Sequence, residues 1–266
     1  MAVSLQAVKI ERSEKLGRLL RRDEPSHLGE STWDLLETAI RAGDKAEAIR
    51  LLGYLHEGET APRHYFYFDW MYGNFSYVAQ NFGEEAYEKM FRSEVTWGLH
   101  DNRLGGFPVE MLTDVEAMVK KQAEIMRGHW PPRGAIVIVE EEDRYVINNF
   151  PCNSGGRMLR SGLAEGKWGL AVITKPHPWA WSKPGKPVYC LHCSLGRGIM
   201  VSEVRGFPIR VYGPPGEGFN PDKAHPFDPC SMIFYKDPDL MPERYFHALG
   251  LKKDPARFKR VIPRSE

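Results

Sequence analysis

The hydrophobic pattern of this chain changes at the Pro131–Pro132 pair, from a helical period before it to β-branched runs after it. Before the pair, apolar residues recur every three or four positions in stretches that end at glycines, which is typical of amphipathic helices. After it, short runs rich in valine and isoleucine stand between clusters of glycine and proline. The sequence therefore predicts an α+β fold, in which an N-terminal helical bundle precedes a mainly antiparallel, proline-rich β region.

The first part of the chain contains five stretches with helical spacing, at 31–44, 44–59, 60–83, 83–102 and 107–130. Residues 1–26 also carry leucines spaced among charges, and we expect an amphipathic helix there. Such a helix would pack either on its own bundle or on a partner subunit, so a homo-oligomer is an open expectation. The chain is thus expected to divide into a helical region, 1–130, an α+β cysteine-containing domain, 133–245, and a C-terminal tail, 246–266.

The second part begins with a predicted hairpin over residues 134–150, whose turn is the acidic stretch 140–143. Further short strands are expected within 167–181, 186–193, 206–215 and 230–238, and a short helix is expected between residues 155 and 167. Prolines shape most of the connecting loops, and rigid loops of this kind often hold functional groups in place.

The net charge of +1 gives no global attraction to nucleic acid or to an anionic membrane surface. No apolar run approaches the roughly 18 residues of a membrane span, and the start of the chain lacks the apolar core of a secretory signal. A cytoplasmic protein with a small-molecule ligand is therefore expected. In that compartment cysteines more often bind metals or carry out redox chemistry than form structural disulfides.

All four cysteines lie in the second part: Cys190 and Cys193 form a C-x₂-C motif, while Cys152 and Cys230 each follow a proline. Zinc is bound tetrahedrally by soft or borderline ligands, and a C-x₂-C turn supplies two of them. We therefore predict a zinc site that uses all four cysteines and staples the β region. Iron or an iron–sulfur cluster is the alternative, because thiolates also suit those groups.

Two other interpretations of the motif remain open. The four cysteines can be unligated, or Cys190 and Cys193 can form a redox pair in which His192 lowers a thiol pKa. A redox C-x₂-C usually stands at the start of a helix, whereas residues 194–203 are expected to lead into another strand. This expectation favours the metal.

A catalytic metal keeps one coordination position for water or substrate, whereas a closed Cys₄ site is structural. In an open site Glu203 or His192 would move the proton of a metal-bound water. His177 and His225 are further histidines that could replace a cysteine ligand.

Two segments are candidates for binding the substrate. The amides of residues 153–156, which include Ser154 and Gly155, can form an anion-binding concavity to which Arg157 adds charge. In the aromatic stretch 64–77, Tyr65, Asp69 and Tyr72 share a face with His64 at its edge, and such a face suits a planar ligand. His64 and Asp69 would then be polar groups of the site, and plain helix packing is the alternative.

The chain resembles a set of bacterial cysteine-motif proteins through three elements: P-C-x-S-G-G-R at 151–157, Y-C-x-H-C at 189–193, and P-C before a strand that ends in Y-K-D-P at 229–238. The resemblance covers roughly residues 55–240. The chain is also distantly similar to the L-2-amino-thiazoline-4-carboxylic acid hydrolase-like group, whose namesake opens a small sulfur–nitrogen ring. The resemblance implies that the four cysteines act together, and it transfers no catalytic residue.

Three functions follow from these observations. The first is a zinc-dependent hydrolase or lyase that acts on a small cyclic or aromatic metabolite. The second is a non-enzymatic small-molecule sensor with a structural Cys₄ zinc. The third is a thiol oxidoreductase that uses Cys190 and Cys193.

Overall fold

The computed structural model describes residues 8–22, 25, 27–100, 103–104, 107–128, 135–150, 152, 154–165, 169–213 and 230–259. These residues combine helices with antiparallel sheets, which confirms the α+β class. Contacts divide the chain into an N-terminal unit, residues 1–68 with 130–133, and a C-terminal unit, residues 69–129 with 134–266. None of the helices in the described ranges combines the length and the apolar character of a membrane span.

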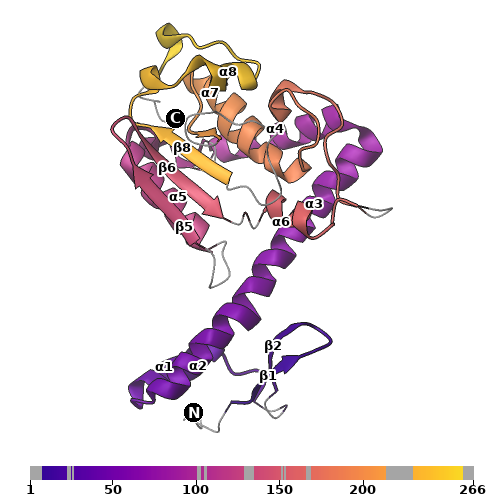
Figure 1. Cartoon of the computed structure of the whole chain (residues 1–266), viewed down its shortest axis with the longest axis vertical. Helices are drawn as coiled ribbons and strands as arrows, with labels where there is room; N and C mark the ends of the chain where they lie inside the picture. The colour runs from indigo at the N-terminus through magenta and orange to yellow at the C-terminus, as the bar shows by residue number, and fades with distance from the viewer. Residues whose placement is uncertain are drawn as a thin grey trace. The chain divides into compact units, whose positions relative to one another are not determined.

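The N-terminal unit combines a β-hairpin with two helices (Figure 1). The hairpin pairs β1 (Ile10–Ser13) with β2 (Arg18–Arg21), and the helices are α1 (Thr32–Arg41) and α2 (Lys45–Tyr54). Asp44 caps α2 by accepting the amide N–H of Glu47 at 3.0 Å. The buried core of this unit consists of Val8, Leu35, Leu36, Ala39, Leu51 and Leu55.

The helix expected over residues 1–26 is wrong for the described part, which forms the β1–β2 hairpin instead. Gly17 has a φ of 65° in the turn, a conformation that glycine adopts without strain and that ends a helix. Two arginines of the hairpin donate to backbone carbonyls outside it, Arg18 to Gly58 O at 3.0 Å and Arg21 to Glu30 O at 2.7 Å. These long-range contacts fix the hairpin and are invisible to local periodicity.

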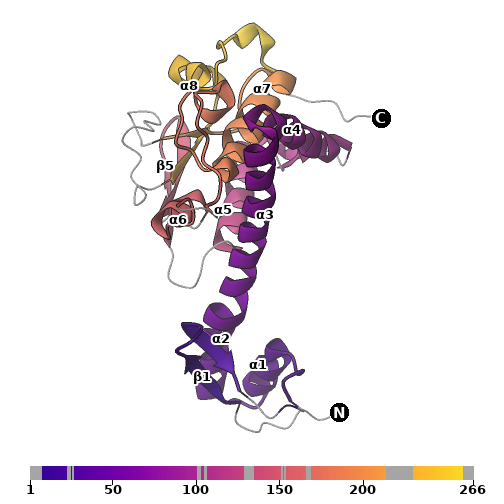
Figure 2. The ribbon, with the colours of Figure 1, turned by 90° about the vertical axis from the view of Figure 1, so that its right-hand side faces the viewer.

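The first four helices of the C-terminal unit lie in stretches that the sequence predicts as helical, whereas the last two do not. The helices are α3 (Ala61–Phe82, which begins in the N-terminal unit), α4 (Glu84–His100), α5 (Val115–Gly128), α6 (Gly155–Arg160), α7 (Met200–Arg205) and α8 (Glu243–Ala248). Short strands β3 (Arg103–Leu104) and β4 (Phe107–Pro108) pair between α4 and α5. Figure 2 shows α3 and α4 from the side.

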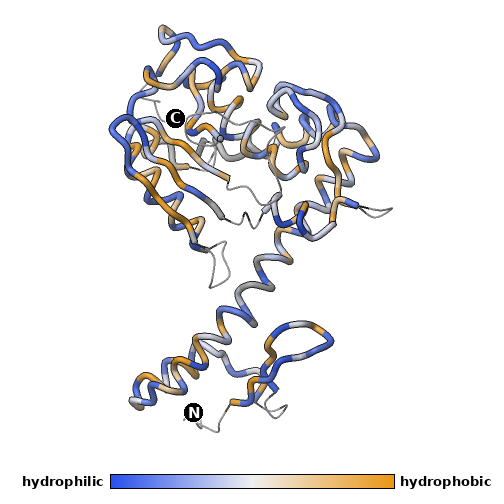
Figure 3. The backbone as a smooth tube through the Cα atoms, in the orientation of Figure 1, coloured by the Kyte–Doolittle hydropathy of each residue, from blue (hydrophilic) through white to orange (hydrophobic). Residues whose placement is uncertain are grey.

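The predicted hairpin is confirmed and forms half of a four-stranded antiparallel sheet with the order β5-β6-β8-β7. The strands are β5 (Ala135–Glu140), β6 (Arg144–Phe150), β7 (Val211–Tyr212) and β8 (Cys230–Tyr235). Hydrophobic colouring runs along much of these strands in Figure 3. β7 and β8 lie within stretches predicted as strands, so the sheet is where sequence and structure agree best.

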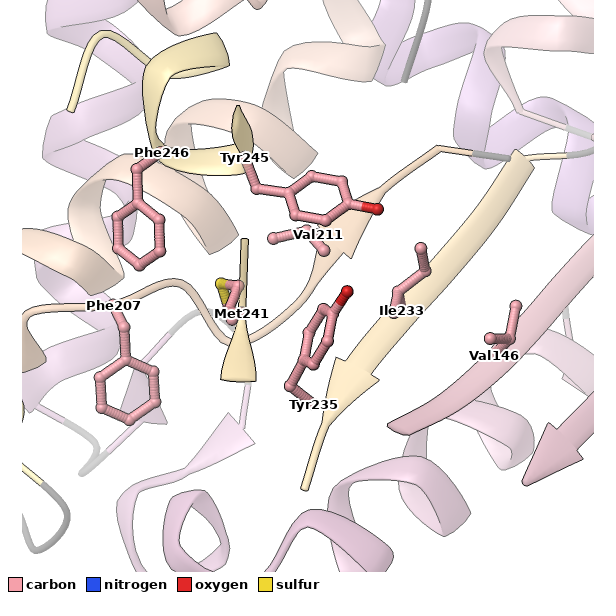
Figure 4. Close-up of a cluster of buried hydrophobic side chains, with 8 residues drawn as sticks. All are labelled: Val146, Phe207, Val211, Ile233, Tyr235, Met241, Tyr245 and Phe246. Carbon is pink, nitrogen blue, oxygen red and sulfur yellow. The ribbon is translucent and has the colours of Figure 1, made fainter. Parts of the chain in front are cut away.

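One face of the sheet carries a row of apolar side chains that α8 covers (Figure 4). The strand register places Val146, Ile233 and Val211 side by side across β6, β8 and β7. Tyr245 and Phe246 of α8 pack on this row together with Phe207, Tyr235 and Met241. Because α8 is held by this core, the residues that it presents toward β7 have a fixed position.

The segment around the C-x₂-C motif is helical, so the strand predicted over residues 186–193 is wrong, and so is the strand expected to follow the motif. Residues Val188–Cys190 form a 3₁₀ turn, His192–Ile199 form a π-helix and Met200–Arg205 continue as α7. Within the described residues 169–181, only an isolated bridge between Val172 and Pro187 has β character. The motif therefore stands at the start of a helical segment, which is where a redox C-x₂-C motif usually stands.

Glu84 in the first turn of α4 fixes the loop that precedes the motif. Its carboxylate accepts the Thr174 amide at 2.6 Å and the Thr174 hydroxyl at 2.7 Å, and it lies 2.7 Å from His177 Nε2. His177 stacks on Trp179 with ring centroids 4.3 Å apart. Burial opposes ionisation, but these hydrogen bonds and the charge of His177 lower the pKa of Glu84.

Replacing Glu84 by glutamine is expected to lower the free energy of unfolding by about 2 kcal/mol at neutral pH, because the donors lose a charged acceptor. A depressed carboxyl pKa stabilises the fold above the unfolded value of about 4.3, and that contribution disappears as the pH falls through the folded pKa. Denaturant titrations of both proteins should therefore converge at acid pH. Glu85→Gln is the matched control, because the pair of Glu85 with Lys175 is exposed, so its loss should change stability little. Equal effects of the two variants would contradict this role of Glu84.

Candidate functional site

The reactive group of the site is the Cys193 thiol, which lies one residue into the π-helix and is paired with His192. The sulfur is 3.2 Å from His192 Nε2, and His192 Nδ1 is 2.5 Å from the carbonyl oxygen of Tyr189. A carbonyl can only accept, so the hydrogen of the imidazole lies on Nδ1 and Nε2 is directed at the thiol. The imidazole is thus oriented to take the proton of Cys193.

Positive charge surrounds Cys193. Burial opposes ionisation, but the charge and hydrogen bond of His192, the guanidinium of Arg210 and the hydroxyl of Tyr212 lower the pKa of Cys193 to about 6. The Arg210 side chain is buried, donates to the Tyr212 hydroxyl at 2.5 Å, and donates to Gln122 Oε1 of α5. A thiolate at this position is therefore the expected state at neutral pH.

Cys193 opens on a cavity of about 190 Å³ at the β7 edge of the sheet, between the π-helix and α8. It is lined by Trp181, Cys193, Ser194, Gly198, Arg210, Val211, Tyr212, Arg244, Tyr245, Ala248 and Leu249. Two arginines and no carboxylate are among these residues, so the cavity favours an anion. Trp181 and Tyr212 meet edge to face, with ring centroids 6.0 Å apart, and supply aromatic walls.

Trp181 reaches the cavity through a strained backbone. Its φ is 56° and its ψ 32°, and Ser182 follows with a φ of 57°. Two consecutive non-glycine residues in the left-handed region are costly and persist where the surroundings enforce them, often at functional sites. Hydrogen bonds from the Ser182 amide to His177 O at 2.8 Å and from the Trp181 amide to Pro178 O at 3.1 Å hold this turn.

Cys152 and Cys190 lie together at the first turn of α6. The amides of Ser154 and Gly156 donate to the sulfur of Cys152, and the amide of Gly155 donates to that of Cys190. Burial is the main reason that the pKa of each thiol is raised, and for Cys190 the charge of Cys152 adds to it. The amides that the sequence predicts as an anion-binding concavity are thus directed at two sulfurs; Asn153 lies outside the described residues.

Cys230 begins β8 and is the fourth member of the group. Burial raises its pKa, and so do the charges of Cys152, Cys193 and Cys190, so all four thiols lie within electrostatic reach of one another. No disulfide links them. However, among the described residues no three His, Cys, Asp or Glu side chains converge as a metal-binding group. As arranged, with Cys193 hydrogen-bonded to His192 and Tyr212, the sulfurs do not form a coordination sphere.

The remaining predicted site residues lie away from the cavity lining. Glu203 of α7 forms an ion pair with Arg92 of α4 at 2.9 Å and is half exposed. Asp69 of α3 pairs with Arg157 of α6. Tyr65 lies on α3 in the N-terminal unit, as does His64, whose side chain is outside the described set, and His225 lies outside the described residues.

Tyr72 is fully buried and packs on Tyr189, with ring centroids 4.5 Å apart. Tyr72 of the aromatic stretch therefore packs against the segment that carries Cys190. This contact agrees with helix packing, the alternative to ligand binding for this stretch. Sequence reasoning missed Arg210, Tyr212 and Arg244, whereas the W-A-W stretch that contains Trp181 is a sequence candidate for an aromatic wall or for the core. No local pattern marks these residues, because Arg210 and Tyr212 lie at β7 and Arg244 lies on α8, and the two elements meet only in three dimensions.

Comparisons with protein-family models, with curated proteins and with solved structures return no match. The function proposed below therefore rests on the geometry of the site.

Proposed function

We propose that this protein is a small-molecule hydrolase whose nucleophile is the thiolate of Cys193. The observation that carries this proposal is the 3.2 Å contact between Cys193 Sγ and His192 Nε2, at the wall of a cavity. A thiol paired with an oriented imidazole is the arrangement that nucleophilic cysteine enzymes use.

In the proposed reaction His192 takes the thiol proton, and the thiolate attacks an electrophilic carbon bound to nitrogen, oxygen or sulfur. The leaving heteroatom departs with the proton returned by His192 Nε2, which leaves the carbon bound to Cys193. Water then attacks this carbon, gives its proton to His192, and releases the product and the free thiol. Arg210 and Tyr212 stabilise the negative charge that develops beside the sulfur.

The lining of the cavity supports a small anionic substrate. Arg210 and Arg244 supply positive charge, and the Trp181 and Tyr212 rings offer flat apolar surface. The resemblance to the thiazoline-carboxylate hydrolase-like group is consistent with hydrolysis at a carbon flanked by heteroatoms.

Covalent trapping with p-nitrophenyl acetate tests this proposal. We expect a burst of about one equivalent of p-nitrophenol at about pH 7, and an acetyl group on the tryptic peptide 168–197, as for other acyl-enzymes. That peptide contains both Cys190 and Cys193, because each lysine within it precedes a proline. The burst should vanish in Cys193→Ser and persist in Cys190→Ser, the matched control; a burst that survives in Cys193→Ser would exclude the proposed nucleophile.

A zinc-dependent hydrolase or lyase is the second candidate, and the mutual proximity of the four thiols favours it. The cysteine sulfurs would have to draw together to bind the ion, with iron or an iron–sulfur cluster as the alternative group. Elemental analysis of the purified chain separates the two candidates. One tightly held metal ion with all four thiols protected from alkylation would favour the metal, and a metal-free chain with a reactive Cys193 would favour the thiolate.

A further inference from the structure

We propose that Cys152 and Cys190 form a redox pair, distinct from the nucleophile Cys193, which is converted to a disulfide by exchange with a low-molecular-weight disulfide. This activity goes beyond the hydrolase and does not depend on it. It rests on how the start of α6 holds the two sulfurs.

The two sulfurs lie against consecutive residues of one helical turn. The sulfur of Cys190 lies against Gly155, and the sulfur of Cys152 lies against the neighbouring Gly156. Because these glycines are successive residues, both sulfurs lie at the first turn of α6. The charge of Cys152 also raises the pKa of Cys190, which is consistent with this proximity.

The glycines at 155 and 156 make this approach possible. A Cβ at position 155 would lie 2.2 Å from Cys190 Sγ, and one at position 156 would lie 2.8 Å from Cys152 Cβ and 3.5 Å from its sulfur. Side chains at these positions would therefore push the cysteines away from the turn. The Gly-Gly pair fits a site where two sulfurs must meet against the backbone.

Tyr72 supplies a second, independent observation. Its hydroxyl is buried, and it has no hydrogen-bond partner among the described residues. Burial raises the pKa of Tyr72, followed by the charges of Cys190 and Cys152, so the hydroxyl lies close to both sulfurs. An unpaired buried donor is costly unless a partner appears during function. A thiolate of the pair is such a partner, because it accepts a hydrogen bond far better than a thiol does.

The exchange proceeds in two steps. The Cys152 thiolate, which accepts two amide hydrogen bonds, attacks a disulfide RSSR; the Cys152–SR bond forms, the RS–SR bond breaks, and one RS⁻ leaves. The Cys190 thiolate then attacks the Cys152 sulfur and releases the second RS⁻. Two electrons pass from the cysteine pair to RSSR, and the two thiol protons leave with the two RSH molecules.

Cross-link mapping of the full chain tests the proposal. The protein is equilibrated in a mixture of oxidised and reduced glutathione, alkylated with N-ethylmaleimide, and digested with trypsin without reduction. The cysteines then fall on three peptides, 145–157, 168–197 and 224–236. We expect a cross-link between 145–157 and 168–197 that persists in Cys193→Ser and is absent in Cys190→Ser.

Three results would overturn the proposal: an internal Cys190–Cys193 disulfide in 168–197, a cross-link to 224–236, or four thiols that all remain alkylated by maleimide in excess oxidised glutathione. Cys193→Ser also separates this activity from the hydrolase, because it removes the nucleophile and leaves the pair intact. Tyr72→Phe keeps the ring and removes the unpaired hydroxyl. It should form the same cross-link about tenfold more slowly, since a hydrogen bond to a charged group is lost, and an unchanged rate would contradict the role of Tyr72.

Discussion

Alanine at position 155 is expected to lower the free energy of unfolding by about 2–3 kcal/mol, as overpacking of a filled site typically does. The new methyl group would lie 2.2 Å from Cys190 Sγ, with Pro187 Cγ behind it at 3.5 Å. Cys190 has a short side chain, so its sulfur cannot yield without leaving the Gly155 backbone. For a chain of this size the melting temperature should fall by several degrees, which denaturant and thermal scans will measure.

Gly73→Ala is the matched control for this prediction. A Cβ at Gly73 would meet nothing within 4 Å, and the residue lies in the middle of α3. Alanine is favoured over glycine there by about 0.5–1 kcal/mol, so this variant should be more stable than the parent. Adding Cys190→Ala to Gly155→Ala should restore part of the loss, because it removes the atom that clashes. If Gly155→Ala and the parent unfold at the same denaturant concentration and temperature, the sulfur of Cys190 does not lie against the α6 turn.

Removal of His192 should produce the largest change in thiol reactivity. In the parent, the alkylation of Cys193 by iodoacetamide should rise with a midpoint at about pH 6, because only the thiolate reacts. Burial opposes that ionisation, so losing the charge and hydrogen bond of His192 moves the pKa of Cys193 upward. In His192→Ala the rate at about pH 6 should therefore fall at least about fivefold, which a pKa rise of one unit or more produces.

The sign of the accompanying stability effect is also fixed. The folded pKa of Cys193, about 6, lies below the unfolded value of about 8.5. The thiolate therefore stabilises the fold above the unfolded pKa, and this contribution is lost as the pH falls toward 6. His192→Ala should flatten this dependence between about pH 6 and 8.5. His247→Ala, at an exposed position of α8, serves as the control; equal rates in His192→Ala and the parent would show that His192 does not activate the thiol.

The elements that the sequence predicts well are those whose contacts are local. The helices at 32–41, 45–54 and 115–128 follow from amphipathic spacing, and the β5–β6 hairpin follows from two β-branched runs around an acidic turn. The β1–β2 hairpin was not predictable in this way, because Arg18 and Arg21 find their partners in segments 9 to 40 residues distant. Local spacing there fits a helix, and tertiary hydrogen bonds override it.

The helix after the C-x₂-C motif was missed for a different reason. Residues 194–200 contain two glycines and little regular spacing, so propensity argues against a helix. In the fold Gly198 is where Leu249 packs: a Cβ there would lie 2.8 Å from Leu249 Cδ1. Close packing against Leu249, which follows α8, thus favours the residue that weakens the local helix signal. The Cys193–His192 pair depends on that helix and could not be derived without it.

The grouping of the cysteines has a consequence for how the chain reaches its native state. Cys152, Cys190 and Cys230 come from segments roughly 40 residues apart in sequence, and they meet only once α6, the 3₁₀ turn Val188–Cys190 and β8 are assembled. Contacts between such distant segments form late, because loop closure costs entropy. Four cysteines allow three fully paired connectivities, so an oxidant that acts before assembly traps pairs that the fold does not use. Nascent chains made under oxidising conditions should therefore give a mixture of misfolded species, whereas reducing conditions should preserve the yield of native protein.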